Sequence, residues 1–173
     1  MSLVKELPSN AQFTTELFQF TPQNWDSIEQ DLLRIEDLAF EGKGYSEEIF
    51  RKDFARPEAI IVILRSPDHK IIGYSYALPV NIEEPEREDE KNETANIDST
   101  AILPEFQGKG LVGTLVGRVE DELRKRHFKF LEREAAAYNG YADSIQKHYQ
   151  GRILDSHDIE SKYGPQRFFR ISL

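Results

Sequence analysis

The 173-residue chain contains no cysteine. Disulfides, thiolate metal sites and a cysteine nucleophile are therefore excluded. The sequence also lacks any apolar run close to the roughly 20 residues that a membrane-spanning helix needs. Residues 1–10, MSLVKELPSN, lack the apolar core of a signal peptide. We therefore expect a cytoplasmic protein that does not associate with membranes.

Positive charge is scarce, because 22 Lys and Arg stand against 31 Asp and Glu and give a net charge of -9 at pH 7. Neutralising nucleic-acid phosphates requires a basic patch, so we expect no nucleic-acid partner, whereas a cationic partner fits this charge. Residues 82–91, IEEPEREDEK, concentrate acidic side chains around a proline. Such blocks are usually solvated loops, and the alternative is a loop that attracts a cationic ligand. The sequence contains no cluster with metal-ligand spacing, so we expect no metal.

Length and hydrophobic periodicity predict one domain over residues 1–173, since no repeat, linker or low-complexity stretch divides the chain. Apolar side chains recur every three or four residues from Trp25 to Ala39 and predict a helix that begins at Thr21 and Pro22. Further helices are expected over residues 46–55, 109–126 and 140–150. Strands are expected over residues 11–21, 59–64, 71–77, 94–102, 128–137, 152–160 and 166–173. This order predicts a mixed α/β fold, with the strands over residues 94–102 and 128–137 parallel to each other.

The stretch over residues 97–120, IDSTAILPEFQGKGLVGTLVGRVE, joins a β-prone run to an amphipathic helix through a glycine-rich turn. Glycines allow successive backbone N–H groups to point into one concavity, and the positive end of the helix dipole adds to it. The turn therefore predicts a site for a pyrophosphate. Gly113 and Gly117 lie inside the helix, where each costs about 1 kcal/mol relative to alanine. Close approach of the helix to the sheet or to a ligand is the expected reason for them.

The glycine spacing leaves other interpretations open. Gly108, Gly110 and Gly113 match the dinucleotide fingerprint, with Glu132 or Glu134 as the ribose-binding acid. Against this, four residues separate the strand from the first glycine, and too little chain follows for the second half of such a sheet. A nucleoside triphosphate loop is excluded because GxxxxGK followed by Ser or Thr is absent. A strand-to-helix turn without any ligand is the remaining alternative.

The segment LPEFQGKGLVGTL resembles the GNAT superfamily of acetyl-CoA-dependent N-acyltransferases. The family signature is Gln or Arg, two residues, Gly, one residue, then Gly or Ala. Gln107 and Gly110 supply the first two positions, whereas Val112 replaces the small last residue and Gly113 follows one place later. When the order of the predicted helices and strands is included, the resemblance covers nearly the whole chain. It implies the acyl-CoA N-acyltransferase fold, a mostly antiparallel mixed sheet with a parallel splayed strand pair, flanked by helices.

The resemblance also implies acetyl-CoA as the co-substrate, held between the splayed strands. Main-chain groups near Ile102 and Leu103 would bind the pantetheine arm, and the amides of residues 108–113 would hold the pyrophosphate. Asn139 ends the following strand, as in the family pattern. The cofactor-binding residues implied in this way are Ile102, Leu103, Gln107, Gly108, Lys109, Gly110, Leu111, Val112, Gly113 and Asn139.

The chemistry that the resemblance implies is direct attack of an amine on the acetyl thioester in a ternary complex. A primary amine has a pKa near 10.4 in water, so a base or a water chain must deliver it neutral. Asp98 lies where family members often carry a glutamate base, and the alternative is a strand residue that faces solvent. Asn96 and Thr100 are expected to share its face by period two. A strand amide near Ile102 would meet the developing oxyanion.

The departing thiolate needs an acid, which is commonly a tyrosine in this family. The tyrosine position of the family holds Gln146 here, and Tyr149 is the nearest substitute. Tyr149 shares a helical face with apolar residues, so a core aromatic is the alternative. Tyr138 and Tyr141 are further candidates.

The acceptor is expected to be a small-molecule or protein amine that contacts residues 40–46 and 162–166. The acidic composition favours a cationic small molecule such as a polyamine or an aminoglycoside. The alternative is an acyl-CoA-binding module without transferase activity, because the expected tyrosine is missing. We expect a monomer or a homodimer, and residues 167–173 would form the dimer contact unless they complete the sheet of their own chain.

Overall fold

The computed structural model describes residues 12–173, so the N-terminal segment used for the signal-peptide prediction lies outside the described residues. The strands are β1 (Thr14–Phe18), β2 (Ile60–Arg65), β3 (Ile71–Pro79), β4 (Thr94–Ile102), β5 (Phe130–Ala136), β6 (Ile153–Ser161) and β7 (Gly164–Ser172). The α-helices are α1 (Pro22–Trp25), α2 (Glu29–Ala39), α3 (Glu47–Phe54), α4 (Leu111–Lys125) and α5 (Tyr141–His148). Two short 3-10 helices, η1 (Pro85–Glu90) and η2 (Pro104–Phe106), precede and follow β4.

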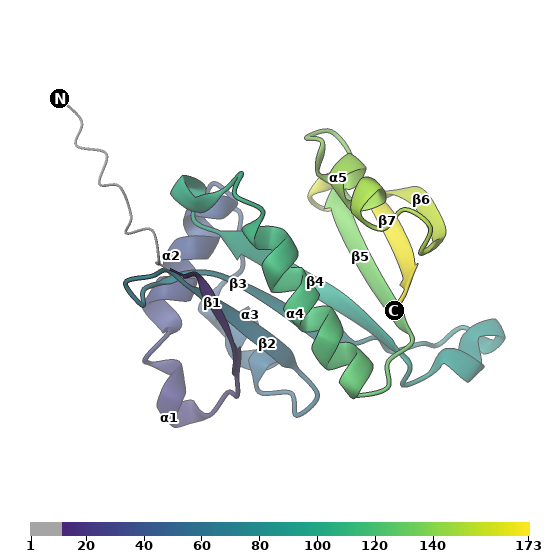
Figure 1. Ribbon diagram of the computed structural model, residues 1–173. Helices are drawn as coiled ribbons and strands as arrows, with labels where there is room; N and C mark the ends of the chain where they lie inside the picture. Colours follow the sequence, from purple (N-terminus) through teal and green to yellow (C-terminus); the bar gives the residue numbers. More distant parts are fainter. Residues whose placement is uncertain (1–11) are drawn as a thin grey trace.

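The strands form one seven-stranded sheet in the order β1-β2-β3-β4-β5-β7-β6. Every neighbouring pair is antiparallel except β4 and β5, which are parallel. Figure 1 shows these two strands side by side at one end and parted at the other. The predicted fold class, a mostly antiparallel mixed sheet with a splayed parallel pair, is confirmed.

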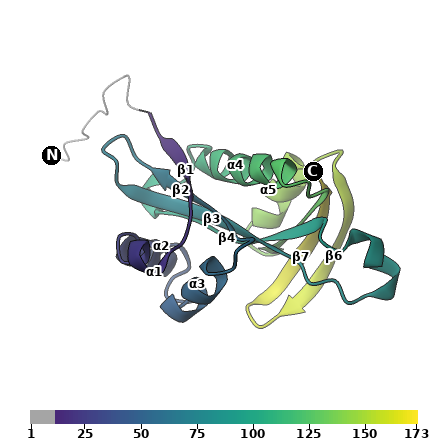
Figure 2. The ribbon, with the colours of Figure 1, turned by 90° about the horizontal axis from the view of Figure 1, so that it is seen from below.

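Helices cover both faces of the sheet. Figure 2 shows α1, α2 and α3 on one side and α4 and α5 on the other. Helix α4 packs against β2, β3 and β4, α5 packs against β5, and α2 packs against β3 and β4. The apolar stripe of each helix and the buried β2 and β3 strands between them explain this layering.

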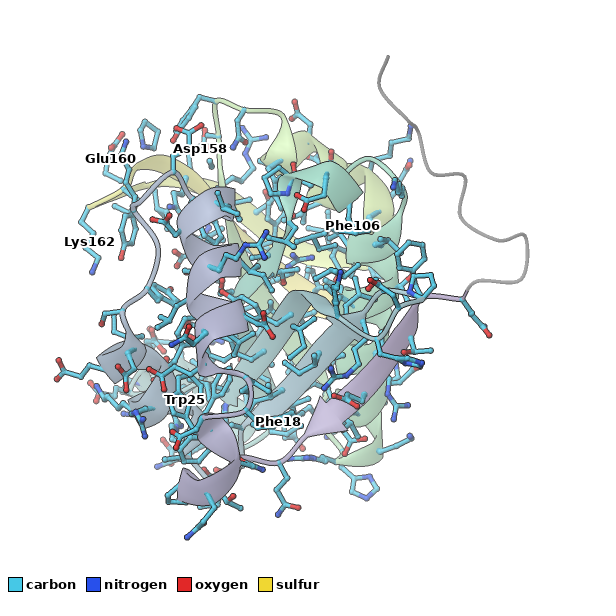
Figure 3. All side chains as sticks on the ribbon, turned by 90° about the vertical axis from the view of Figure 1, so that its left-hand side faces the viewer. Phe18, Trp25, Phe106, Asp158, Glu160 and Lys162 are labelled. Atoms are coloured by element: carbon cyan, nitrogen blue, oxygen red, sulfur yellow. The ribbon has the colours of Figure 1, made fainter. Side chains whose placement is uncertain are left out.

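Aromatic side chains dominate the core beneath α1–α3. Trp25, Phe50, Tyr74 and Tyr76 are fully buried. The centre of the Phe50 ring lies 6.3 Å from that of Trp25, in a tilted contact, and 5.5 Å from that of Tyr74, in an edge-to-face contact. Figure 3 labels Trp25 among the side chains beneath the N-terminal helices. This cluster joins the helices to β3, which carries both buried tyrosines.

The first predicted helix is divided in two, which corrects the sequence prediction. Thr21 and Asn24 form a capping box, with the Thr21 amide donating to the Asn24 side chain at 2.8 Å and the Asn24 amide donating to Thr21 Oγ1 at 3.1 Å. The Ser27 hydroxyl then donates to the Asn24 carbonyl at 2.6 Å. A side chain that bonds the backbone locally competes with helix propagation, so α1 ends at Trp25 and α2 begins after a turn.

The acidic segment over residues 82–91 folds partly as η1 and is attached to the sheet. Arg87 donates to Glu90 at 2.9 Å and to Glu132 of β5 at 2.5 Å. Arg170 of β7 donates to Glu132 at 3.0 Å and also pairs with Glu90. Part of the acidic charge is therefore neutralised within the chain.

We expect Phe50→Ala to lower the free energy of unfolding by about 3–5 kcal/mol, because the ring is fully buried among aromatic neighbours and its removal leaves a cavity. Urea denaturation measures the change. Phe40→Ala serves as the control, since Phe40 is 39% exposed and should lose far less. Equal losses in the two variants would contradict the packing described for the core.

Candidate active site

The parting of β4 from β5 creates the site. The two strands pair only from Thr94 opposite Phe130 to Asn96 opposite Glu132. Beyond this point β4 remains paired with β3, and β5 remains paired with β7. The facing edges of β4 and β5 therefore carry main-chain groups that the sheet does not use. A peptide-like ligand arm could pair with such an edge.

The glycine-rich turn lies at the open end of these strands. Gly108 and Gly110 adopt φ angles of +75° and +76°, and Gly110 is the residue before α4 begins. The Gln107 side chain donates to the Ile102 carbonyl at 3.0 Å and so holds the turn against the end of β4. Within residues 12–173, the amides of residues 108–113 have no hydrogen-bond acceptor. Unpaired amides at a helix N-terminus favour anion binding, and these amides begin the 15-residue helix α4.

The space above the turn is open. A Cβ added at Gly108, Gly110, Gly113 or Gly117 would meet nothing within 4 Å among the described residues. Close packing on the sheet is therefore not the reason for Gly113 and Gly117. Open space alongside the helix remains as their explanation. Val112, which stands where the family has a small residue, packs against the core.

The two predicted strand residues, Ile102 and Leu103, differ in whether their main-chain groups are free to bind a ligand. The Leu103 amide donates to the Ile72 carbonyl at 2.9 Å, and the Leu103 carbonyl accepts from Phe106. Leu103 therefore has no unused main-chain group to offer a ligand. Because main-chain direction alternates along a strand, the Ile102 amide faces away from β3 and toward β5.

The other predicted cofactor residues lie in the glycine-rich turn, at the start of α4 or, for Asn139, between β5 and α5. Leu111 is buried and anchors the start of α4 in the core. The Lys109 ammonium lies 5.1 Å from the centre of the Phe106 ring. The Asn139 side chain accepts from the Tyr141 amide at 3.0 Å, so Asn139 shapes the turn between β5 and α5.

Asp98 sits in a β-bulge at the point where the strands part. Tyr76 is opposite Ser99 and Ala77 is opposite Ile97, so Asp98 has no partner of its own on β3. Bulges re-aim side chains and are common beside active sites. The Asp98 carboxylate lies 2.7 Å from the Tyr76 hydroxyl, which lies 2.9 Å from Asp53 of α3. The bulge thus places Asp98 on the face that α1–α3 cover.

Comparison with known proteins agrees with this geometry. Residues 25–144 match the acetyltransferase (GNAT) family, which is more than half of the chain. The chain belongs to the GNAT acetyltransferase family. The parted parallel pair is the feature of this fold that the resemblance in the sequence implies.

Solved structures of low sequence identity share the fold. A GNAT family acetyltransferase from Elizabethkingia anophelis with acetyl-CoA bound is 17% identical, with a TM-score of 0.61 over 93% of this chain and 98% of that one. A mutant of spermidine N-acetyltransferase from Vibrio cholerae is 17% identical, with a TM-score of 0.63 over 94% and 95%. The ribosomal-protein-alanine N-acetyltransferase from Brucella melitensis is 14% identical, with a TM-score of 0.65 over 91% and 99%. A search of curated proteins found no match.

The bulge in β4 corrects the prediction that Asn96 and Thr100 both share the face of Asp98. Asn96 lines the same pocket as Asp98, as period two predicts. Thr100 does not share this face, because the extra residue of the bulge inverts the alternation beyond it. The Thr100 hydroxyl lies 2.8 Å from the Ser75 hydroxyl. Ser75 stands between Tyr74 and Tyr76, whose side chains face α2 and α3, so Ser75 and Thr100 face the opposite side of the sheet.

Tyr149 and Asp98 are not brought together. Tyr149 is fully buried, and its hydroxyl donates to Glu120 of α4 at 2.6 Å. Arg133 of β5 donates to the same hydroxyl at 3.4 Å, and burial raises the pKa of Tyr149. These partners lie on the face that α4 and α5 cover, opposite the Asp98 face. The placement favours the core-aromatic interpretation of Tyr149.

A pocket of about 310 Å³ opens beside Asp98. Its lining includes Asn96, Glu132, Glu134 and Phe168, which come from β4, β5 and β7. Desolvation, together with the negative charges of Asp98 and Glu132, raises the pKa of Glu134. A larger cavity of about 460 Å³ between α2 and the β2–β3 hairpin contains none of the predicted catalytic residues.

The sequence analysis missed the polar groups beneath Asp98. Glu36 of α2 is 2% exposed, accepts from the Tyr45 amide at 2.8 Å and also accepts from the Tyr74 hydroxyl. Tyr76 connects Asp53 to Asp98. A signal was present, since Tyr74 and Tyr76 are two residues apart in an otherwise apolar strand and must find polar partners when buried.

We expect Glu36 to make stability depend on pH. Burial raises the pKa of Glu36 despite the hydrogen bonds from Tyr74 and Tyr45. Because the pKa is raised in the folded state, the folded protein binds this proton more tightly than the unfolded chain does. Glu36 therefore stabilises the fold fully below about pH 4.5, and this stabilisation is lost as the pH rises through the pKa of Glu36 in the folded protein. Glu36→Gln should remove this loss. Urea denaturation between pH 4 and 8 measures it, and an unchanged pH slope in the variant would contradict the assignment.

Proposed function

We propose that the protein transfers an acetyl group from acetyl-CoA to a primary amine by direct attack in a ternary complex. The observation that carries the proposal is the row of unpaired amides over residues 108–113 at the end of a strand that has parted from its parallel neighbour. Family membership supports the reaction class. The buried network around Asp98 lies beside the same opening.

The residues that would hold acetyl-CoA are those of the turn and the free edge of β4. The amides of residues 108–113 would bind the pyrophosphate, with the dipole of α4 behind them. The Ile102 amide would face the thioester end and meet negative charge that develops on the carbonyl oxygen. Acetyl-CoA supplies an activated acyl group, so the protein needs no covalent intermediate of its own.

Asp98 would take a proton from the amine. It lines the 310 Å³ pocket and lies on the bulge beside the parted strands. An amine that enters as the ammonium ion must lose a proton before it can attack, and a carboxylate acting directly or through one water removes it. Tyr149, whose hydroxyl is bonded to Glu120, holds α5 against α4 in this proposal and does not protonate the departing thiolate. The CoA sulfur leaves as the thiolate when its bond to the acetyl carbon breaks, and it takes its proton from solvent water.

The acceptor that we propose is a cationic small-molecule amine. Asp98 and Glu134 both line the pocket, and Phe168 offers an aromatic surface to a cation. Arg56 lines the pocket as well and offsets one of these negative charges. Glu132 contributes less charge, because Arg87 and Arg170 are bonded to it. The β6–β7 turn reaches the side of the sheet that α2 and α3 cover, where Figure 3 labels Glu160 and Lys162. A protein amine is the other acceptor class to be screened.

We expect Gly110→Asp to abolish binding of acetyl-CoA, because it places a carboxylate in the proposed anion cradle of residues 108–113 and strains a residue at φ +76°. Isothermal titration calorimetry of both proteins with acetyl-CoA, and with NAD as a control ligand, measures this. Gly151→Asp is the matched control, since Gly151 has φ +85° and equally open surroundings but lies outside the turn. Loss of binding in the control variant, or NAD binding that Gly110→Asp removes, would contradict the proposed cradle.

We expect Asp98→Asn to lower kcat by about 10²-fold or more while acetyl-CoA affinity stays unchanged, because only the proton acceptor is removed. Release of free CoA thiol with spermidine, kanamycin and an N-terminal alanine peptide measures turnover. Tyr149→Phe should remain active. If the wild-type protein binds acetyl-CoA and releases no thiol with any amine, the binding-module alternative holds instead.

A further inference from the structure

Two carboxyl groups share one phenol beneath the bulge at Asp98. The Tyr76 hydroxyl oxygen lies 2.9 Å from Oδ2 of Asp53 and 2.7 Å from Oδ2 of Asp98. A phenol has one proton to donate. Two oxygen–oxygen contacts of hydrogen-bond length therefore require a second proton, and one of the two carboxyl groups must carry it.

Asp53 is the carboxyl group placed to carry this proton. It lies near the end of α3 beneath the sheet, whereas Asp98 lines the pocket. Burial raises the pKa of Asp53, and the charge of Asp98 raises it further. The Tyr76 hydrogen bond and the cations Lys52 and Arg56 act in the opposite direction without cancelling the shift.

The surroundings of Asp98 make a second ionised carboxylate unfavourable. The charge of Asp98 acts on Glu36 of α2, on Tyr45 after α2 and on Glu134 of β5. Burial raises the pKa of each of these groups, and the charge of Asp98 adds to the effect. Glu132 and the cation Arg56 line the same pocket as Asp98, and Arg87 and Arg170 are bonded to Glu132. Like charges that share a site cannot all ionise without cost.

We propose that Asp53 and Tyr76 are positioning residues for Asp98. The protonated Asp53 carboxyl donates to the Tyr76 oxygen, and the Tyr76 hydroxyl donates to the Asp98 carboxylate. Asp98 thus stays ionised and oriented, and the proton that leaves the attacking amine goes to Asp98 while those of Asp53 and Tyr76 stay in place. This inference rests on the proposed function, in which Asp98 is the base.

The location of the proton can be measured without turnover. Carbon-13 NMR of the aspartate carboxyl carbons follows each group in the whole protein, with Asp53→Asn and Asp98→Asn used for assignment. We expect the Asp53 signal to keep its protonated position after that of Asp98 has changed on raising the pH. Ionisation of Asp53 before Asp98 would overturn the proposal. This NMR measurement does not require turnover, so it tests the protonation of Asp53 even if the protein acetylates no amine. Failure of this inference and failure of the proposed function can therefore be told apart.

Kinetic pH profiles test the functional part, using the best amine from the screen. Asp53→Asn keeps a neutral donor to Tyr76, so kcat should stay within about 3-fold of wild type, whereas Asp53→Ala should lower it about 10-fold with KM for acetyl-CoA unchanged. Tyr76→Phe removes a hydrogen bond to the ionised Asp98 and should move the acid limb of the profile up by about one pH unit. Dividing each profile by that of wild type cancels ionisation of the amine.

Tyr74→Phe is the matched control for Tyr76→Phe. Tyr74 is equally buried, and its ring lies 6.4 Å from that of Tyr76, but its hydroxyl contacts Glu36 and Ser99. It should lose comparable stability in thermal unfolding while the acid limb stays in place. Equal shifts in the two tyrosine variants, or equal losses in Asp53→Asn and Asp53→Ala, would overturn the proposal.

Discussion

The rest of the site depends on the parting of β4 and β5. Each strand has a full antiparallel partner on its outer side, so the parallel pairing between them can end after Asn96 and Glu132 without breaking the sheet. The separation leaves main-chain donors and acceptors on the facing edges of β4 and β5 that the sheet does not use. A ligand with an amide-bearing arm can satisfy them as a further strand would.

The two faces of the sheet carry different groups of polar side chains. Beneath α4 and α5, the buried Glu120 accepts from the buried Tyr149 hydroxyl and pairs with Arg124 and Arg152, whose side chains remain partly exposed. Beneath α1–α3, the phenols of Tyr74 and Tyr76 connect acidic groups from the helices to the bulged part of β4. The chemistry that we propose belongs to the second face, and the amides that begin α4 bring the anion site to the same opening.

Most of the fold could be predicted from the sequence because periodicity and turn residues act locally. The strand over residues 94–102 and the glycine turn agree with the structure, as does the helix that follows. The break after Trp25 could not be predicted, because it depends on the Ser27 side chain, which takes the Asn24 carbonyl from the helix. The burial of Tyr149 beside Glu120 arises from long-range packing that helical spacing alone does not reveal.

The bulge could not be predicted from the sequence either. Period two assumes strict alternation along the strand, and it therefore predicted that Thr100 shares the face of Asp98. The pairing of Tyr76 with Asp53 and Asp98 joins segments that lie more than 20 residues apart, and sequence spacing carries no information on such contacts. The cradle itself needed no long-range information, because it is built from consecutive residues.

The most direct test of the account follows the backbone amides of the glycines during titration with acetyl-CoA. Nitrogen-15 NMR resolves glycine signals well enough to compare the turn with distant controls. The account predicts large shifts for Gly108, Gly110 and Gly113 and little change for Gly42 and Gly151. Saturation with acetyl-CoA that leaves the three turn signals in place would contradict it.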